Sequence, residues 1–173
     1  LLEQIAKETQ EPGEFMTRLN AAYSKIFSNA NELMFATACC VCLDLNTGML
    51  RHANAGHPLP MVMAPDGTVT MAEVEESALG PALGLFGDAS YRHMEIPLTP
   101  GERLVFYTDG LTEARNGEQK EFEEDGLIRS LETHKAQPLP ELLAAVVSDA
   151  VEFAGSPTFE DDVCVLGIHY AGG

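Results

Sequence analysis

The sequence predicts an α+β fold in which antiparallel β-sheets are covered by helices. Strands joined by short turns fill the middle of the chain, whereas helical patterns lie near the front and just ahead of the last strand. The chain has 173 residues and 45% hydrophobic content, which is enough for one domain with a full-sized core. No repeat or linker divides it, so residues 1–173 are predicted to form a single domain.

The front of the chain is predicted to be helical. Residues 1–11 are compatible with the end of a helix, and Pro12-Gly13 breaks it. From Glu14 to Phe27 apolar residues recur with helical spacing, which predicts an amphipathic helix packed on a sheet.

Two β-hairpins are predicted next. The apolar runs 34–43 and 49–55 flank the turn signal Asn46-Thr47-Gly48, and the runs 61–64 and 69–74 flank Pro65-Asp66-Gly67. Residues 77–90 follow no period and are predicted to be irregular.

Three strands and two helices complete the prediction. Residues 91–98 alternate as a strand does, and Pro100-Gly101 turns the chain into a second strand at 104–108. Helices are predicted for 122–134 and 138–154, and the last strand for 163–170.

Asp109 is the first candidate functional residue. It directly follows the apolar run 104–108 and precedes Gly110, so its carboxylate can face a cleft while the sheet holds its backbone. Such a position suits a metal ligand. An Asp-Gly pair also turns a chain without any further role, and that alternative stays open at this point.

A second acidic cluster, Glu160-Asp161-Asp162, runs directly into the last strand. If the strands at 104–108 and 163–170 are antiparallel neighbours, the two sets of carboxylates meet at one edge of a sheet. Crowded carboxylates oppose one another's ionisation and therefore favour a cation. Mg²⁺ or Mn²⁺ is the expected occupant of such an oxygen site.

The net charge and the rest of the composition argue against several classes of protein. A net charge of −17 argues against a nucleic-acid or anionic-membrane surface. No window of bilayer length lacks charged residues, and no signal-peptide pattern opens the chain. The four cysteines lie in apolar, strand-like runs that fit a reducing compartment, so a cytoplasmic protein is expected.

Five short motifs between Asn54 and Val163 form a recognisable set, and the likeness that they indicate extends from about Pro12 to Tyr170. They are Asn54-Ala-Gly-His-Pro58, Leu83-Gly84, Pro100-Gly-Glu102, Tyr107-Thr-Asp-Gly-Leu-Thr-Glu-Ala114 and Asp161-Asp162-Val163. This set resembles the metal-dependent protein Ser/Thr phosphatases of the PPM family. The branch that it resembles is the bacterial one typified by the stage II sporulation protein E phosphatase domain.

The resemblance implies a sandwich of two antiparallel sheets flanked by helices, with two Mn²⁺ or Mg²⁺ ions at one edge. The ions would activate a water that hydrolyses phosphoserine or phosphothreonine on a partner protein. By position, Asp109 and Asp161 correspond to catalytic metal ligands. Asp162 corresponds to a further metal residue or to a loop anchor. His57 stands between a glycine and a proline after a hairpin, so it is expected to be a structural hydrogen-bonding residue, and the resemblance does not make it a metal ligand.

The resemblance also implies partners. The substrate would be a small phosphorylated anti-sigma-factor antagonist, and the full protein would carry an upstream sensor or receiver domain. A homodimer is among the states considered.

The front of the chain departs from the family pattern. Family members open with a strand that bears Gly-Asp, whereas residues 1–33 contain no aspartate and the chain starts at Leu1. The domain is therefore predicted to be N-terminally incomplete. The alternative is a catalytically inactive, PPM-like regulatory or dimerisation domain, and a metal-dependent nuclease is disfavoured by the negative charge.

Overall fold

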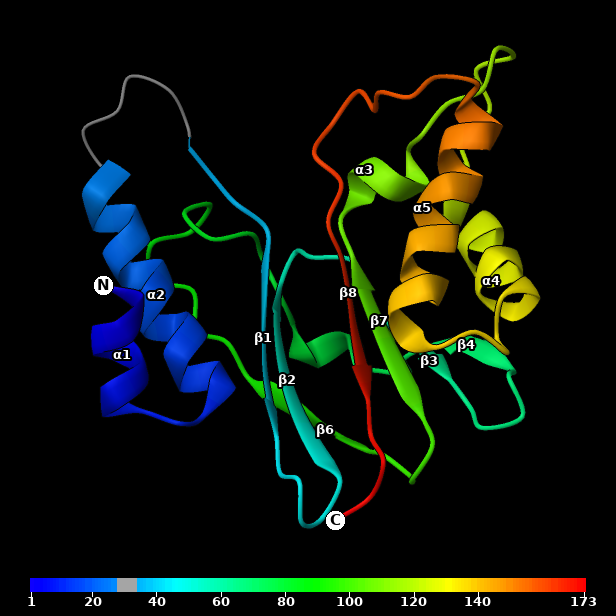
Figure 1. Ribbon diagram of the computed structural model, residues 1–173. Helices are drawn as coiled ribbons and strands as arrows, with labels where there is room; N and C mark the ends of the chain where they lie inside the picture. Colours follow the sequence, from blue (N-terminus) through cyan, green and yellow to red (C-terminus); the bar gives the residue numbers. More distant parts are fainter. Residues whose placement is uncertain (28–33) are drawn as a thin grey trace. The chain divides into compact units, whose positions relative to one another are not determined.

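The computed structural model describes residues 1–27 and 34–173 (Figure 1). Its helices and strands follow the predicted apolar runs. These residues form two units, each with one four-stranded sheet. One unit comprises Leu1–His57 and Glu73–Leu98 with Gly173, and the other comprises Pro58–Ala72 and Thr99–Gly172. The predicted fold class, α+β with two antiparallel sheets and helices, is confirmed.

In the first unit, β2 is the centre of the sheet. It pairs in antiparallel fashion with β1 and β6, and two of its residues pair in parallel with the short β5. The strands are β1 (Ala38–Leu43), β2 (Met49–Ala55), β5 (Leu79–Gly80) and β6 (His93–Pro97). The first predicted hairpin is therefore confirmed, although β1 is shorter than the predicted run.

Helices α1 (Leu2–Glu8) and α2 (Pro12–Phe27) belong to the same unit (Figure 1). The predicted amphipathic helix is confirmed, but it begins at Pro12 instead of Glu14. Proline is compatible with the first helical turn because the N–H that it lacks has no partner there. Met16 of α2 is buried against Ala53 and Ala55 of β2, which holds the helix on the sheet.

The segment predicted to be irregular contains β5 and most of the short helix η1 (Glu76–Ala78), and Leu83 forms an isolated antiparallel bridge with Ala36. The buried side chain of Asn20, on α2, holds the neighbouring backbone. Its Nδ2 donates to the carbonyl oxygen of Phe86 at 2.9 Å, and its Oδ1 accepts from the N–H of Gly84 at 2.9 Å. A helix side chain thus supplies the hydrogen bonds that a strand partner would otherwise provide.

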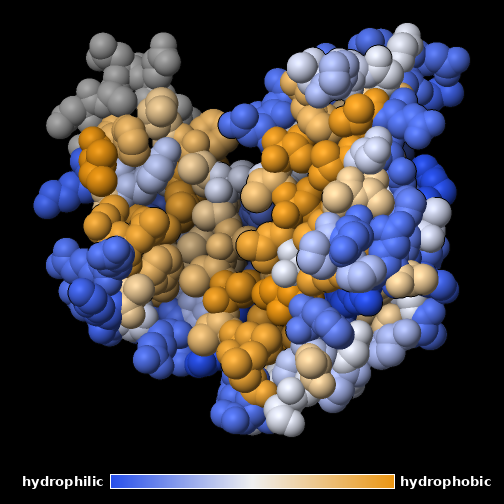
Figure 2. All heavy atoms as spheres, viewed as in Figure 1, coloured by the Kyte–Doolittle hydropathy of each residue, from blue (hydrophilic) through white to orange (hydrophobic). Residues whose placement is uncertain are grey.

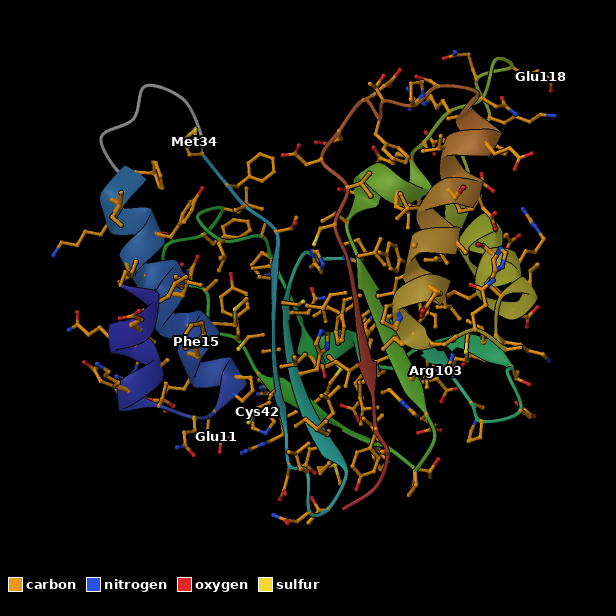
Figure 3. The ribbon with its side chains drawn as sticks, in the orientation of Figure 1. Glu11, Phe15, Met34, Cys42, Arg103 and Glu118 are labelled. Atoms are coloured by element: carbon orange, nitrogen blue, oxygen red, sulfur yellow. The ribbon has the colours of Figure 1, made fainter. Side chains whose placement is uncertain are left out.

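Arg51 connects β2 to the α1–α2 connection. Its guanidinium donates to Glu11 and, at 3.7 Å, to the Sγ of Cys42, two residues labelled in Figure 3. The short connection between the helices is therefore tied to the sheet.

The second unit contains a sheet with the order β4-β3-β7-β8, antiparallel throughout. Its strands are β3 (Met61–Met63), β4 (Val69–Met71), β7 (Arg103–Tyr107) and β8 (Val165–His169). The second predicted hairpin, β3 with β4, is confirmed. The turn at Pro100-Gly101 does not close a hairpin, because β6 pairs with β2 whereas β7 pairs with β3 and β8.

Three helices complete the second unit: α3 (Asp109–Thr112), α4 (Glu123–Thr133) and α5 (Leu139–Ala154). Leu142, Val146 and Ala150 line one side of α5 and are fully buried in the core of this unit. Arg103, labelled in Figure 3, donates to the carbonyl oxygen of Gln137 at 3.0 Å and so ties the start of β7 to the α4–α5 connection. None of the described helices is long and apolar enough to cross a membrane.

Candidate metal centre

The end of β7 and the start of β8 lie at one edge of the second sheet. The two strands are antiparallel, with Arg103 opposite His169 and Tyr107 opposite Val165. The condition on which the acidic site was predicted is therefore met. Asp109 follows the end of β7, and Asp161 and Asp162 precede β8, so both acidic segments leave the sheet at the same edge.

Thr108 extends this pairing beyond the strands. Its N–H donates to the carbonyl oxygen of Cys164 at 3.1 Å. Its hydroxyl donates to the carbonyl oxygen of Asp162 at 2.8 Å and accepts from the N–H of Cys164 at 2.9 Å. The backbone of the acidic loop, residues 160–162, is thereby fixed to the end of β7.

Gly110 allows the two acidic segments to touch. A Cβ at this buried position would lie 2.7 Å from the carbonyl oxygen of Asp162 and 3.2 Å from that of Asp161. Because the nearest atom belongs to the backbone, any other residue would push the segments apart. Glycine is required at position 110 because the backbone of Asp161 and Asp162 comes so close.

Asp109 begins α3, so the turn that an Asp-Gly pair forms elsewhere is replaced by one helical turn. Its Oδ1 accepts from the N–H of Gly110 at 3.1 Å. The Oδ1 of Asp161 accepts from the N–H of Asp162 at 2.7 Å. All three aspartates are exposed, which leaves their remaining oxygens available to a ligand.

A small hollow of about 50 Å³ lies beside this junction, and Gly110, Glu113, Arg115, Glu160 and Asp161 contribute to its lining. The Arg115 guanidinium donates to the Oε1 of Glu121 at 2.7 Å. This hydrogen bond raises the pKa of Arg115, and the nearby carboxylates of Glu160 and Glu113 add to the effect. One fixed positive charge therefore accompanies the acidic groups.

A larger pocket of about 590 Å³ adjoins Asp161 and Asp162. Apolar residues of α5, of the loop before β8 and of β8 itself supply most of its lining: Leu143, Ala144, Val147, Phe159, Val163 and Val165. Figure 2 shows apolar side chains gathered over α5 and β8. The acidic edge is thus bordered by an apolar hollow of the same unit.

A divalent cation at this edge would need several oxygen ligands. Within residues 1–27 and 34–173, no group of three or more His, Cys, Asp or Glu side chains is arranged to hold a metal ion. The chemistry of the donors nevertheless fits Mg²⁺ or Mn²⁺, which bind carboxylate and carbonyl oxygens. Because Gly110 has no side chain, the segments of Asp109 and Asp161 lie close together. This close approach is compatible with one ion bound by both segments.

His57 lies in the first unit, where its main chain is held by Asn54. Asn54 Nδ2 donates to the carbonyl oxygen of His57 at 2.7 Å, and its Oδ1 accepts from the N–H of His57 at 3.1 Å. These bonds fix the backbone at His57, and the structural role of its side chain stays a prediction.

Sequence reasoning missed Thr108. Its position at the end of the apolar run was recognised only as the last residue of a strand. A hydroxyl residue immediately before Asp-Gly is the signal that could have found it, because threonine at a strand end can bond to a neighbouring backbone through its side chain.

Residues 1–171 match the family described as Stage II sporulation protein E (SpoIIE). The chain belongs to the SpoIIE family. Two curated relatives are Protein IcfG of Synechocystis sp., 26% identical over 136 residues, and the phosphoserine phosphatase RsbP of Bacillus subtilis, 23% identical over 156 residues. The alignments cover 79% and 90% of this chain but only 21% and 36% of those proteins, so the chain corresponds to a minor part of each.

Solved structures show the PP2C-type (PPM) fold. The SiaA-PP2C domain of Pseudomonas aeruginosa superposes with a TM-score of 0.81 at 23% identity, covering 97% of this chain and 65% of that one. The SpoIIE phosphatase domain of Bacillus subtilis, presoaked with manganese, superposes with a TM-score of 0.64 at 15% identity, covering 97% and 70%. The predicted family and fold are therefore confirmed.

Proposed function

We propose that this SpoIIE-family chain is a metal-dependent protein Ser/Thr phosphatase module of bacterial signalling. The observation that carries the proposal is the contact at the β7–β8 edge, where Gly110 brings the segment of Asp109 against the backbone of Asp161 and Asp162. Membership of the family and the likeness to a phosphoserine phosphatase support it.

Asp109 and Asp161 would hold Mn²⁺ or Mg²⁺, with Asp162 beside them. Bound divalent ions supply an activated water and neutralise charge on phosphoryl oxygens. The chain's own contribution is to hold carboxylates of segments distant in sequence at one rigid sheet edge. The manganese-soaked SpoIIE domain supports Mn²⁺ as the first ion to test.

The proposed substrate is a phosphoserine or phosphothreonine of a partner protein, with a phosphorylated anti-sigma-factor antagonist as the leading candidate. The name of the relative RsbP, a phosphoserine phosphatase, supports a phosphoserine substrate. We further propose a cytoplasmic protein with an upstream sensor or receiver domain, and a homodimer is one of the states to be tested. The net charge of −17 disfavours nucleic acid as a partner.

Asp109→Asn and Asp161→Asn test the assignment in the complete protein. Each should lower Mn²⁺-dependent hydrolysis of a phosphoserine peptide by about 100-fold or more, because a metal ligand contributes several kcal/mol of transition-state stabilisation. Thermal stability should not fall, since each change removes one of several crowded negative charges.

Asp66→Asn is the matched control. Asp66 belongs to the β3–β4 turn of the same unit, where its Oδ1 accepts from the N–H of Thr68 at 2.9 Å, and asparagine can accept the same bond. The control loses one negative charge and should keep full activity. Wild-type activity in both Asp109→Asn and Asp161→Asn would refute the proposal.

The second candidate function is a non-catalytic regulatory or dimerisation domain. It is favoured by the finding that the described residues hold no group of three ligands. Calorimetric titration of the complete protein with Mn²⁺ separates the two candidates. Binding that Asp109→Asn weakens supports the enzyme, whereas a folded protein with no Mn²⁺ binding and no hydrolysis supports the regulatory domain.

A further inference from the structure

We infer that the Thr108 hydroxyl is a positioning group for the candidate metal centre. Its two hydrogen bonds fix the positions of Asp161 and Asp162 relative to Asp109. The inference rests on the proposed function for its consequence in Mn²⁺ binding, but its structural part can be tested on the metal-free protein.

The hydroxyl uses both of its hydrogen-bonding roles on the acidic loop. It donates to the carbonyl oxygen of Asp162 and accepts from the N–H of Cys164, at 2.8 Å and 2.9 Å. A hydroxyl is the smallest side-chain group that can do both at once. The two bonds bracket the loop segment that directly follows Asp161, so they fix its backbone from both sides.

The contact at Gly110 shows why the position of the acidic loop matters for the candidate site. With the backbone oxygens of Asp162 and Asp161 only 2.7 Å and 3.2 Å from the site of a Cβ, the acidic loop lies directly against the start of α3. The Thr108 hydroxyl bonds to the same Asp162 oxygen that Gly110 approaches. One side chain thus holds the atom at which the two acidic segments meet.

Stability alone does not account for the arrangement. The backbone N–H of Thr108 already closes the sheet by donating to the carbonyl oxygen of Cys164 at 3.1 Å. Asp162 and Cys164 are exposed, so water can satisfy their backbone groups if the hydroxyl is removed. Losing the hydroxyl should therefore free the loop without unfolding the unit.

Three variants separate positioning from stability. Thr108→Val removes the hydroxyl but keeps the branched shape that suits a strand, and Thr108→Ser keeps the hydroxyl. Thr133→Val is the matched control, because the hydroxyl of Thr133 also donates to a backbone carbonyl of this unit, that of Arg129 at 2.7 Å. Thr133 is exposed near the end of α4 and takes no part in the acidic edge.

Two readouts are needed for each variant of the complete protein. Amide hydrogen exchange at Cys164 in the absence of metal should be at least about tenfold faster in Thr108→Val than in the wild type, because the N–H loses its acceptor. The dissociation constant for Mn²⁺, measured by calorimetry, should rise about 10- to 100-fold, as expected when a group that orients a ligand is lost. Thr108→Ser should restore both values, and Thr133→Val should change neither.

The possible results are distinguishable. Unchanged exchange at Cys164, unchanged Mn²⁺ affinity in Thr108→Val, or a Thr108→Ser variant as impaired as Thr108→Val would overturn the inference while leaving the proposed function intact. A wild-type protein that binds no Mn²⁺ would refute the proposed function. The metal part of the inference would then fall with it, and the exchange rate at Cys164 would decide only whether Thr108 holds the backbone that follows Asp161.

Discussion

Thr108 and Gly110 act on the same carbonyl oxygen, that of Asp162, in opposite ways. Thr108 attracts it through a hydrogen bond of 2.8 Å, and Gly110 admits it by having no side chain. Asp109 lies between these two residues in the sequence, so it is held at the same edge of the sheet as Asp161. At the scale of residues, the candidate site depends as much on a hydroxyl and a missing Cβ as on the carboxylates themselves.

His52 is the residue in the first unit with the clearest consequence for pH. It is fully buried on β2, and desolvation, with a smaller contribution from the charge of nearby His57, lowers its pKa to about 4. In the unfolded chain the pKa is near 6.5. Between these values the unfolded chain binds a proton that the folded one does not. Folding stability should therefore be lost as pH falls from about 6.5 through about 4, by up to about 3 kcal/mol.

Urea unfolding at pH 7 and pH 4.5 tests this prediction. Carboxylates also contribute to acid destabilisation, so the comparison with a non-titrating variant is decisive. His52→Gln should show a smaller loss of unfolding free energy between the two pH values than the wild type. His169→Gln, which changes an exposed histidine on β8, should keep the wild-type loss. Equal pH dependence in His52→Gln and the wild type would contradict the prediction.

At the scale of elements, α5 shows how one helix is positioned and ended. Its buried residues recur every four positions, which directs one side of the helix to the core of the second unit. Gly155 ends it with a left-handed φ of 66°, and its N–H donates to the carbonyl oxygens of Val151 and Glu152 at 3.0 Å and 3.2 Å. The chain then turns toward the acidic loop.

Gly155→Ala should destabilise the protein by about 1 kcal/mol, because a Cβ is unfavourable in the left-handed region. No atom lies within 4 Å of the added Cβ, so backbone conformation is the whole cause. Gly117→Ala is the matched control, since its Cβ also meets nothing within 4 Å and its φ is not left-handed. Thermal unfolding should show a lower Tm for Gly155→Ala alone. The same Tm in both variants would show that the cap has no energetic role.

At the scale of the whole molecule, charge is the dominant property. Acidic residues outnumber basic ones by 27 to 10, which leaves a net charge of −17. Such an excess destabilises the folded state through self-repulsion, and it also favours cations at the acidic edge.

Salt should therefore stabilise the protein. Raising NaCl from 0.01 M to 0.1 M shortens the Debye length from about 30 Å to about 10 Å, so repulsion between distant carboxylates is screened. We expect the unfolding free energy to increase by about 1 kcal/mol, measured as a higher urea midpoint. KCl should act equally, because screening depends on ionic strength. A midpoint that stays constant or falls with either salt would mean that self-repulsion is not limiting.

Several features of the fold and the site could be predicted before any coordinates. Apolar alternation and turn residues located both hairpins and the last strand, and the helical period located α2, α4 and α5. The meeting of the two acidic segments was conditional on antiparallel pairing of β7 with β8, and the structure shows that pairing. The motifs around Asp109 and Asp161 were enough to indicate the family, which the match over residues 1–171 shows.

The sequence by itself determined which faces of α4 and α5 are buried, because the period of apolar side chains reports the face that a helix turns to its core. Only the tertiary structure decided which strands pair across the chain, as when β6 joined β2 instead of β7. It also decided the details at the acidic edge: Asp109 begins a helix, Gly110 touches Asp162, and Thr108 bonds to the loop before β8. These contacts join residues about fifty positions apart, and they depend on ångström-scale distances that no local pattern encodes.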